Sequence, residues 1–467
     1  MTKAVRENTG VSMRRAGDEY AEVEKALLAR WPETRIAPTL DRMVTLLDLL
    51  GDPHRAYPVI HVAGTNGKGS TARMIEALLR ELNLRTGRYA SPHLQSMTER
   101  ITLDAEPITA ERFVATYREI EPFLALVDAD LDVPLSYFEV ITAMGFVAFA
   151  DAPVDVAVVE VGLGGTWDAT NVADGQVAVV TPVALDHSEY LGDAVDLIAG
   201  EKAGNIKPGA MALLAAQSPT AAEVLVQRIG EVGATGAREG VEFGVRQRDM
   251  AVGGQLVDLQ GVAAEYEDVF IPLYGAHQAQ NAATAVAAVE AFIGGGREAL
   301  DVDTVRAAFG RVTAPGRIEV LRRGPVIIAD SAHNPAGAAA LASSLEDDFA
   351  STVMVAVVAV MSDKDVEGIL AELAGAVEVV VCTTNSSARS LPAADLARVA
   401  ERVFDEDKVF RADALPDAID LGLAIAERDA TFGGFGVIVT GSVVTAGDAR
   451  RAVGLPVPDG ESNGGRT

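Results

Sequence analysis

The 467-residue sequence is 49% hydrophobic and 23% charged, which is the balance of a globular protein long enough for two or three domains. Its formal net charge of −28 argues against a general binder of nucleic acid or membrane surfaces, because both functions need basic patches. The one cysteine, Cys382, excludes an internal disulfide and fits a reducing compartment. The longest apolar run, Val353 to Met361, is far shorter than the ~20 residues of a membrane helix. We therefore expect a cytoplasmic protein.

The first part of the chain predicts strands that alternate with helices. Residues 1–17 have the composition of a flexible tail. The predicted helices cover residues 18–29, 39–50, a stretch from about Ser70, and 138–149, and the predicted strands cover 59–63, 88–90, 154–161 and 177–181. This alternation is typical of the α/β class, with a doubly wound and mostly parallel sheet.

The second part of the chain predicts a smaller α/β domain. Residues 210–271 have a mixed pattern with short β-like pieces, and 278–292 form an alanine-rich helical pattern. A linker over 312–317 contains Pro315 and Gly316, and beyond it strands are predicted over 326–329, 353–360, 379–383 and 437–440. We therefore expect an N-terminal domain over residues 18–313 and a Rossmann-like C-terminal domain over 314–467, with a second tail from about residue 456.

A glycine-rich loop with a single lysine, Lys68, follows the first predicted strand. Strand, glycine loop and helix together are typical of a phosphate site of the P-loop type, because backbone N–H groups, the helix N-terminus and the lysine all favour an anion. The spacing departs from the usual pattern, since Gly64 lies only three positions before Gly67 and Gly69 separates Lys68 from Ser70. An ordinary glycine-rich turn is the alternative, and the flanking strand and helix favour phosphate binding.

Polar residues also follow other predicted strands. Glu160 ends an apolar strand, where a carboxylate is costly unless it is paired or holds a metal; a solvated edge residue is the alternative. His187 is as compatible with a surface histidine as with a metal ligand, and Lys202 taken alone has the pattern of a surface lysine.

The predicted C-terminal domain also has polar residues directly after a predicted strand. Asp330 and His333 follow one of its strands, and Arg317 in the linker could reach bound phosphates, although a plain linker arginine is the alternative. One crevice in each domain suggests a ligand held between the two domains.

Read together, these segments form an ordered set of motifs from about residue 36 to 450. In chain order they are His61-Val-Ala-Gly-Thr-Asn-Gly-Lys-Gly-Ser70, Ser91-Pro-His-Leu94, Glu99-Arg100, Tyr137-Phe-Glu139, Glu160-Val-Gly-Leu-Gly-Gly165, Asp168-Ala-Thr-Asn171, Asp186-His187, Glu201-Lys-Ala-Gly204, Gly275-Ala-His-Gln278, Asn281, Pro315-Gly-Arg-Ile-Glu319, Asp330-Ser-Ala-His-Asn-Pro335, Asp363-Lys-Asp365 and Val439-Thr-Gly-Ser442. The set resembles the folylpolyglutamate synthase/dihydrofolate synthase family of the Mur ligase superfamily. One departure is Ser331, where the family usually has glycine.

The resemblance implies an ATP-dependent ligase that adds L-glutamate to dihydropteroate, to reduced folates, or to both. The γ-phosphate of ATP would pass to the acceptor carboxylate, and the amine of glutamate would displace phosphate from the acyl phosphate. Such a transfer needs positioning and charge neutralisation more than acid–base chemistry. The expected cofactors are ATP and Mg²⁺ at two sites, the expected partners are small-molecule substrates without nucleic acid or membrane, and the expected state is a monomer.

The resemblance also assigns roles to matching positions. The catalytic residues would be Lys68, His187, Lys202 and Asp330. ATP would be bound by Gly64, Thr65, Asn66, Gly67, Lys68, Gly69, Ser70, Asn281, Arg317, Asp330 and His333. Magnesium would be bound at Ser91, Glu160, His187 and a carbamylated Lys202, since carbamylation turns a cation into an anionic oxygen ligand. The pterin side would be formed by Tyr137, Phe138, Asp168 and Ala169, and Ser442 would help to hold glutamate.

Two other functions remain as alternatives. A muramyl-peptide ligase would share the loop and the mechanism, but Gly69, the Ser91-Pro-His-Leu94 motif and the lack of an extra N-terminal domain argue against it. A non-catalytic nucleotide-binding module is the other. The argument against it is the presence of all five expected site residues, Lys68, Ser91, Glu160, His187 and Lys202.

Overall fold

The computed structural model describes residues 17–32, 37–130, 132–430 and 434–456. The two predicted tails lie almost wholly outside these residues, except that residue 17 begins a helix that runs to residue 28. Within the described ranges, no helix is both long and apolar enough to cross a lipid bilayer.

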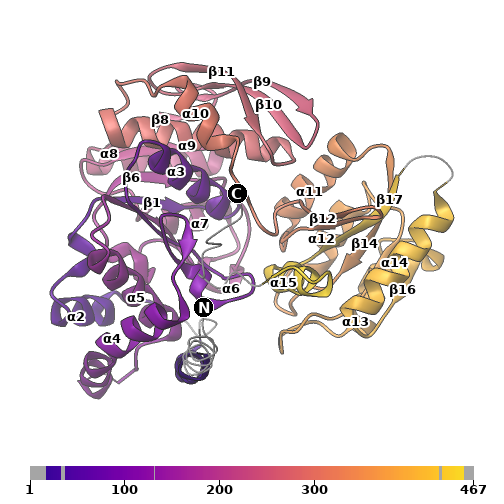
Figure 1. Ribbon diagram of the computed structural model, residues 1–467, viewed down its shortest axis with the longest axis horizontal. Helices are drawn as coiled ribbons and strands as arrows, with labels where there is room; N and C mark the ends of the chain where they lie inside the picture. The colour runs from indigo at the N-terminus through magenta and orange to yellow at the C-terminus, as the bar shows by residue number, and fades with distance from the viewer. Residues whose placement is uncertain (1–16, 33–36, 131, 431–433, 457–467) are drawn as a thin grey trace, which may run out of the picture.

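An eight-stranded sheet with the order β4-β3-β2-β5-β1-β6-β7-β8 forms the centre of the N-terminal part (Figure 1). Its strands are β1 (Val59–Ala63), β2 (Thr86–Tyr89), β3 (Ile101–Leu103), β4 (Glu106–Pro107), β5 (Val156–Glu160), β6 (Gly175–Val180), β7 (Met211–Leu214) and β8 (Thr235–Arg238). All are parallel except β3 and β4, which add an antiparallel edge. The predicted doubly wound, mostly parallel sheet is thereby confirmed. Because β1 pairs with both β5 and β6, the loops after these three strands meet at one edge of the sheet.

Helices cover both faces of this sheet, because alternate side chains of its buried strands point to opposite sides. One face packs against α3 (Lys68–Glu81), α9 (Ala276–Gly294) and α10 (Val302–Phe309). The other face packs against α2 (Asp41–Leu49), α4 (Ala110–Asp130), α5 (Tyr137–Asp151), α7 (Val195–Ala203) and α8 (Pro219–Val232). The short helices are η1 (Pro53–Arg55), η2 (Met97–Arg100), η3 (Ala169–Val172) and α6 (Ser188–Leu191).

Two local features of this part differ from the prediction or extend it. Helix α3 begins at Lys68, two residues earlier than expected, because Gly67 completes the turn with a φ of 87° and the helical backbone starts directly after it. The mixed segment before α9 contains a separate antiparallel sheet of β9 (Gly244–Ala251), β10 (Gly254–Gln260) and β11 (Glu265–Ile271), which packs on α9 and α10 at the top of Figure 1.

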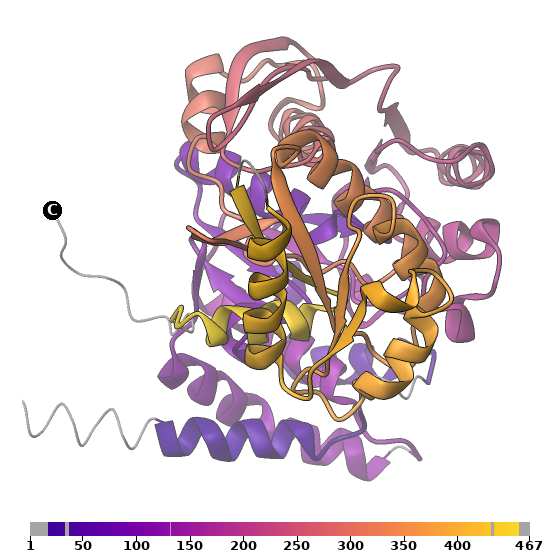
Figure 2. The ribbon, with the colours of Figure 1, turned by 90° about the vertical axis from the view of Figure 1, so that its right-hand side faces the viewer.

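A six-stranded sheet with the order β12-β13-β17-β14-β15-β16 forms the C-terminal part (Figure 2). Its strands are β12 (Glu319–Arg323), β13 (Val326–Ala329), β14 (Thr352–Val358), β15 (Val380–Cys382), β16 (Val409–Arg411) and β17 (Gly434–Thr440), of which only β12 is antiparallel. One face packs against α11 (Pro335–Asp348), α12 (Val366–Leu373) and α13 (Ala393–Ala400), and the other against α14 (Leu415–Asp429) and α15 (Val443–Ala452). A short η4 (Glu406–Lys408) precedes β16. The predicted division at residues 313 and 314 falls in the segment between α10 and β12.

Candidate active site

The glycine loop between β1 and α3 lies directly on the end of β6. A Cβ atom on Gly64 would lie 1.9 Å from Thr181 Oγ1, so only glycine fits this approach. Asn281 of α9 closes the other side, because a Cβ on Gly67 would lie 2.7 Å from its Oδ1. Lys68 Nζ donates to the carbonyl oxygens of Gly64 and Thr65 at 3.1 and 3.2 Å. The loop and the start of α3 therefore have the strand–loop–helix geometry in which backbone N–H groups can bind an anion, and phosphate binding at this loop stays a prediction.

Three predicted charged residues gather beneath this loop. Glu160 ends β5 and is 5% exposed, and burial raises its pKa although Lys68 and Arg317 oppose the rise. Lys202 of α7 is 4% exposed, and burial together with the charge of Lys68 lowers its pKa to about 7. Burial also lowers the pKa of Lys68, against the attraction of Glu160. The site is thus a buried cluster of opposite charges, in which the charge of Lys68 acts to lower the pKa of both Glu160 and Lys202.

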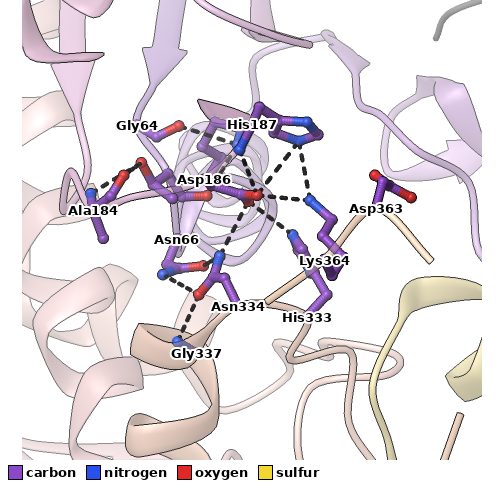
Figure 3. Close-up of polar contacts among 12 residues, drawn as sticks. Gly64, Asn66, Ala184, Asp186, His187, His333, Asn334, Gly337, Asp363 and Lys364 are labelled. Carbon is purple, nitrogen blue, oxygen red and sulfur yellow. Dashed lines mark hydrogen bonds and ion pairs between the residues drawn. The ribbon is translucent and has the colours of Figure 1, made fainter. Parts of the chain in front are cut away.

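Asp186, just past the end of β6, joins the two halves of the molecule (Figure 3). Its Oδ1 accepts a hydrogen bond from Lys364 Nζ at 2.6 Å, and its Oδ2 accepts one from Asn334 Nδ2 at 3.1 Å and lies 3.3 Å from His333 Nε2. Burial favours the neutral acid, but the hydrogen bond from His333 and the charges of His187 and Lys364 hold the pKa of Asp186 well below its usual range. Asp186 is therefore a carboxylate anchored by three C-terminal side chains.

The side chains of Asn66 and Asn334 make a second link between the halves. Each amide donates to the other, at 3.2 and 3.1 Å, so the glycine loop is paired with the first residue before α11 (Figure 3). Asn334 Oδ1 also accepts from the N–H of Gly337 at 2.8 Å and caps α11. A single asparagine therefore fixes both a helix end and the loop opposite it.

Asp330 holds the linker against the C-terminal sheet. Its Oδ2 accepts from the N–H of Ile318 at 2.9 Å, and the neighbouring Arg317 lines a small cavity beside the glycine loop. Ser331, the departure from the family's glycine, is buried and donates its hydroxyl to the carbonyl of Gly316 at 2.8 Å. The serine is therefore accommodated by a hydrogen bond to the linker, and the site is not disturbed.

A small cavity of about 110 Å³ lies beside the glycine loop. Eight of the predicted ATP residues line it, namely Asn66, Gly67, Gly69, Ser70, Asn281, Arg317, Asp330 and His333. Gly64, Thr65 and Lys68 do not line it, although Thr65 and Lys68 belong to the same hydrogen-bonded loop. The cavity is bounded by both parts of the chain.

A larger cavity of about 500 Å³ opens on the other side of Asp186. Its lining includes the predicted residues Ser91, Phe138, Asp168, Ala169, His187, His333 and Ser442. Tyr137 does not line it, because its ring is buried with the guanidinium of Arg100 5.0 Å from its centre. Within this lining Asp168 accepts from the N–H groups of Leu163 and Thr170 at 2.8 and 3.0 Å, and burial raises its pKa although the Thr170 side chain opposes the rise.

Several residues of this site have no role in the set that the family resemblance implies. Lys364 and Asn334 lie inside quoted motifs, so their sequence signal was present and only the contact with Asp186 was missing. Trp31, Trp167, Met361 and Arg389 line the large cavity with no local pattern that marks them. Their grouping is a product of the tertiary fold.

The described residues hold no cluster of three or more His, Cys, Asp or Glu side chains with metal-binding geometry. Two of the predicted magnesium ligands, Ser91 and a carbamylated Lys202, are not of these residue types. Glu160 and Ser91 lie together, since the Ser91 N–H donates to the Glu160 carboxylate, and they offer the hard oxygen donors that Mg²⁺ prefers. The residues present therefore fit such an ion.

Comparisons with known proteins agree with this geometry. The Mur ligase middle domain matches residues 62–289, and the Mur ligase glutamate ligase domain matches residues 316–443. A dihydrofolate synthase/folylpolyglutamate synthase of Mycobacterium tuberculosis is 50% identical over 462 residues, which covers 94% of this chain and 95% of the relative. The chain belongs to the dihydrofolate synthase/folylpolyglutamate synthase family. The resemblance inferred from the motifs is confirmed.

Solved structures of family members have the same fold. The M. tuberculosis folylpolyglutamate synthase complexed with ADP matches with a TM-score of 0.90 at 50% identity, over 94% of this chain and 99% of that one. E. coli FolC in complex with DHPP and ADP matches with a TM-score of 0.80 at 30% identity, over 93% and 97% of the two chains. Members of the family have thus been solved with nucleotide bound.

Proposed function

We infer that this chain is an ATP-dependent ligase that joins L-glutamate to the carboxylate of a folate through an acyl phosphate. The observation that carries the inference is that His333 lines both cavities and pairs with Asp186, whose carboxylate also pairs with Lys364 and His187 of the large cavity. A nucleotide held at the glycine loop would direct its γ-phosphate toward this junction, and an acceptor in the large cavity would direct its carboxylate to the same point. Two sites that meet at one polar junction suit a phosphoryl transfer followed by attack of an amine.

Different residues of the chain would bind the nucleotide and stabilise the reacting groups. Lys68 and the loop N–H groups would bind the phosphates, with Asn281, Arg317 and Asp330 holding the rest of the nucleotide. Lys364 and His333, fixed by Asp186, would stabilise the charge that develops on the acceptor carboxylate and the transferred phosphoryl group. The amine of glutamate then attacks the acyl carbon, a C–N bond forms, and phosphate leaves. Closure of the two halves would keep water from the acyl phosphate.

We propose two Mg²⁺ sites at this junction. Ser91 and Glu160 would hold one ion, and His187 with a carbamylated Lys202 the second; when bound, the ions neutralise phosphate charge. Carbamylation requires an unprotonated amine that attacks CO₂ and releases a proton. The pKa of Lys202, lowered to about 7 by burial and by Lys68, supplies that amine near neutral pH. The burial of Lys202 protects the product from hydrolysis.

The large cavity would bind the acceptor and the incoming glutamate. Phe138 and Ala169 offer an apolar wall beside Asp168 for the pterin. Ser442 caps α15 by accepting from the N–H of Thr445 at 3.0 Å, and the positive end of this helix suits a carboxylate of glutamate. We propose that the chain acts as a monomer, with domains over residues 18–313 and 314–467.

The test is the incorporation of labelled L-glutamate with Mg-ATP, in separate reactions with dihydropteroate and with a tetrahydrofolate. Product in both reactions assigns both activities, and product in one assigns that activity alone. If neither yields product while ATP binds, the acceptor is wrong, and a UDP-muramyl acceptor is then the substrate to try.

A further inference from the structure

The loop between β2 and η2, residues 91–96, forms part of the large cavity and is stiff. Ser91 and Pro92 line that cavity, and the Ser91 N–H donates to Glu160. The carboxylate of Glu99 accepts hydrogen bonds from the N–H groups of Leu94, Gln95 and Ser96 at 2.9, 2.9 and 2.8 Å. One carboxylate thus fixes three successive N–H groups of the loop, three residues along the chain from Ser91.

Leu94 at the tip of this loop is docked on the C-terminal part. Its side chain packs with the apolar cluster that α14 and α15 form with their sheet. A Cβ on Gly447 of α15 would lie 2.2 Å from the Leu94 carbonyl oxygen, and a Cβ on Gly316 would lie 3.2 Å from Leu94 Cδ1. The contact therefore depends on glycine at position 447 of α15, and Gly316 of the linker lies close against the end of the Leu94 side chain.

Arg450, on the next turn of α15, binds the same loop through Gln95. It is 9% exposed, its Nε donates to Gln95 Oε1 at 3.0 Å, and its Nη1 is paired with Glu319. Glu319 in turn accepts from the N–H of Gly316 at 2.8 Å. One buried guanidinium thus links the loop, the linker and α15. Helix α15 lies on the side of the C-terminal part that faces the N-terminal part (Figure 1).

The two ends of α15 meet the reaction site in different ways. Its N-terminal cap, Ser442, lines the large cavity, while Gly447 and Arg450 hold the loop that carries Ser91 to the same cavity. We propose that Leu94 and Arg450 are positioning residues that couple the seating of the C-terminal domain to the placement of Ser91 at the acceptor cavity. The inference rests on the proposed function for its kinetic consequence, whereas the docking itself is measurable without turnover.

The experiment compares Arg450→Ala with Arg428→Ala, a control in the same domain whose exposed guanidinium pairs with Asp429. Hydrogen exchange of the full-length protein is followed for peptides that cover residues 91–99. We expect Arg450→Ala to speed their exchange about tenfold and Arg428→Ala to leave it unchanged. In steady-state assays, Arg450→Ala should raise the KM for the folate acceptor about tenfold, with the Kd for ADP within about twofold of the parent protein.

Two further variants test the contact independently of charge. Gly447→Val should push on the Leu94 carbonyl and give the same exchange pattern with Arg450 intact, and Arg450→Lys should restore part of the protection because one partner can still be bound. Unchanged exchange over 91–99 in both Arg450→Ala and Gly447→Val would overturn the docking. Equal changes in the acceptor KM and the Kd for ADP would overturn the positioning role, and so would an unchanged acceptor KM. If the parent protein forms no glutamyl product while the exchange difference persists, the proposed function fails and the docking stands.

Discussion

The two cavities differ in how the sequence builds them. The small one is lined largely by three short motifs, the glycine loop, the α9 start and the segment after β13. The large one is lined by many short pieces of chain from Trp31 to Val444, spread over both parts of the molecule. A phosphate is recognised by backbone N–H groups and one lysine, which a contiguous loop can supply. A large acceptor needs surface from many elements, and only the fold assembles that surface.

The same contrast holds for charge. A chain with a net charge of −28 must create a local positive field to bind ATP, and it does so with Lys68 and Arg317 near the small cavity. Lys364 supplies a positive group at the junction, where the carboxylate of Asp186 holds both Lys364 and the ring of His333. We therefore expect nucleotide binding to depend on the glycine loop together with the residues from 317 to 333 that line the small cavity, and acceptor binding to depend on how the two halves are joined at Asp186. The variants below separate these two dependences.

The largest effect is expected for Lys68→Ala. Loss of the lysine removes a buried positive charge at the phosphates, so phosphate release should fall by about 10³-fold or more with the fold intact. Steady-state phosphate release with saturating substrates measures the loss, and circular dichroism checks the fold. Lys25→Ala, at an exposed position of the first helix, is the matched control. Turnover that survives Lys68→Ala would show that the loop does not hold the reacting phosphates.

A reciprocal pair of variants separates the two cavities. Asp168→Asn puts an amide NH₂ among the donors of Leu163 and Thr170, so the KM for the folate acceptor should rise about 30-fold while the KM for ATP stays the same. Asn281→Ala opens the side of the glycine loop, so the KM for ATP should rise by about tenfold and that for the acceptor should not. For each variant, initial rates measured while ATP and the folate acceptor are both varied give the two KM values. If both variants shift both constants alike, the cavities are not separate binding sites.

The parts of the site that lie in continuous motifs could be predicted from the sequence. The parallel strands, the glycine loop and the polar residues at the ends of β5, β6 and β13 follow from local pattern and from the rule that such ends share an edge. The antiparallel sheet of β9 to β11 was only partly visible, because alternation on an exposed sheet is weak there. The roles of Lys364 and Asn334 depend on contacts to Asp186 made across 148 or more positions, which no local pattern encodes.

A smaller effect on activity is expected when pH changes the protonation of Lys202. Because burial lowers the pKa of Lys202 to about 7, its neutral amine predominates above pH 7 and its protonated form below. Protonation prevents carbamylation, so activity should fall about tenfold for each pH unit below 7 and recover when bicarbonate is raised. A ¹³C-bicarbonate NMR experiment should show a carbamate signal that Lys202→Arg lacks. Activity that is indifferent to bicarbonate at pH 6 would exclude the modified lysine.

The smallest effect concerns the amide pair of Asn66 and Asn334, which links the two halves of the molecule directly. A neutral hydrogen-bonded pair contributes about 1 kcal/mol, so Asn66→Ala should lower kcat/KM for ATP about fivefold. Asn334→Ala should cost more, because Asn334 also caps α11 and donates to Asp186. A double-mutant cycle removes these extra losses and isolates the pair. A coupling energy near zero would mean that closure depends on Asp186 and its C-terminal partners, and that the amide pair only accompanies it.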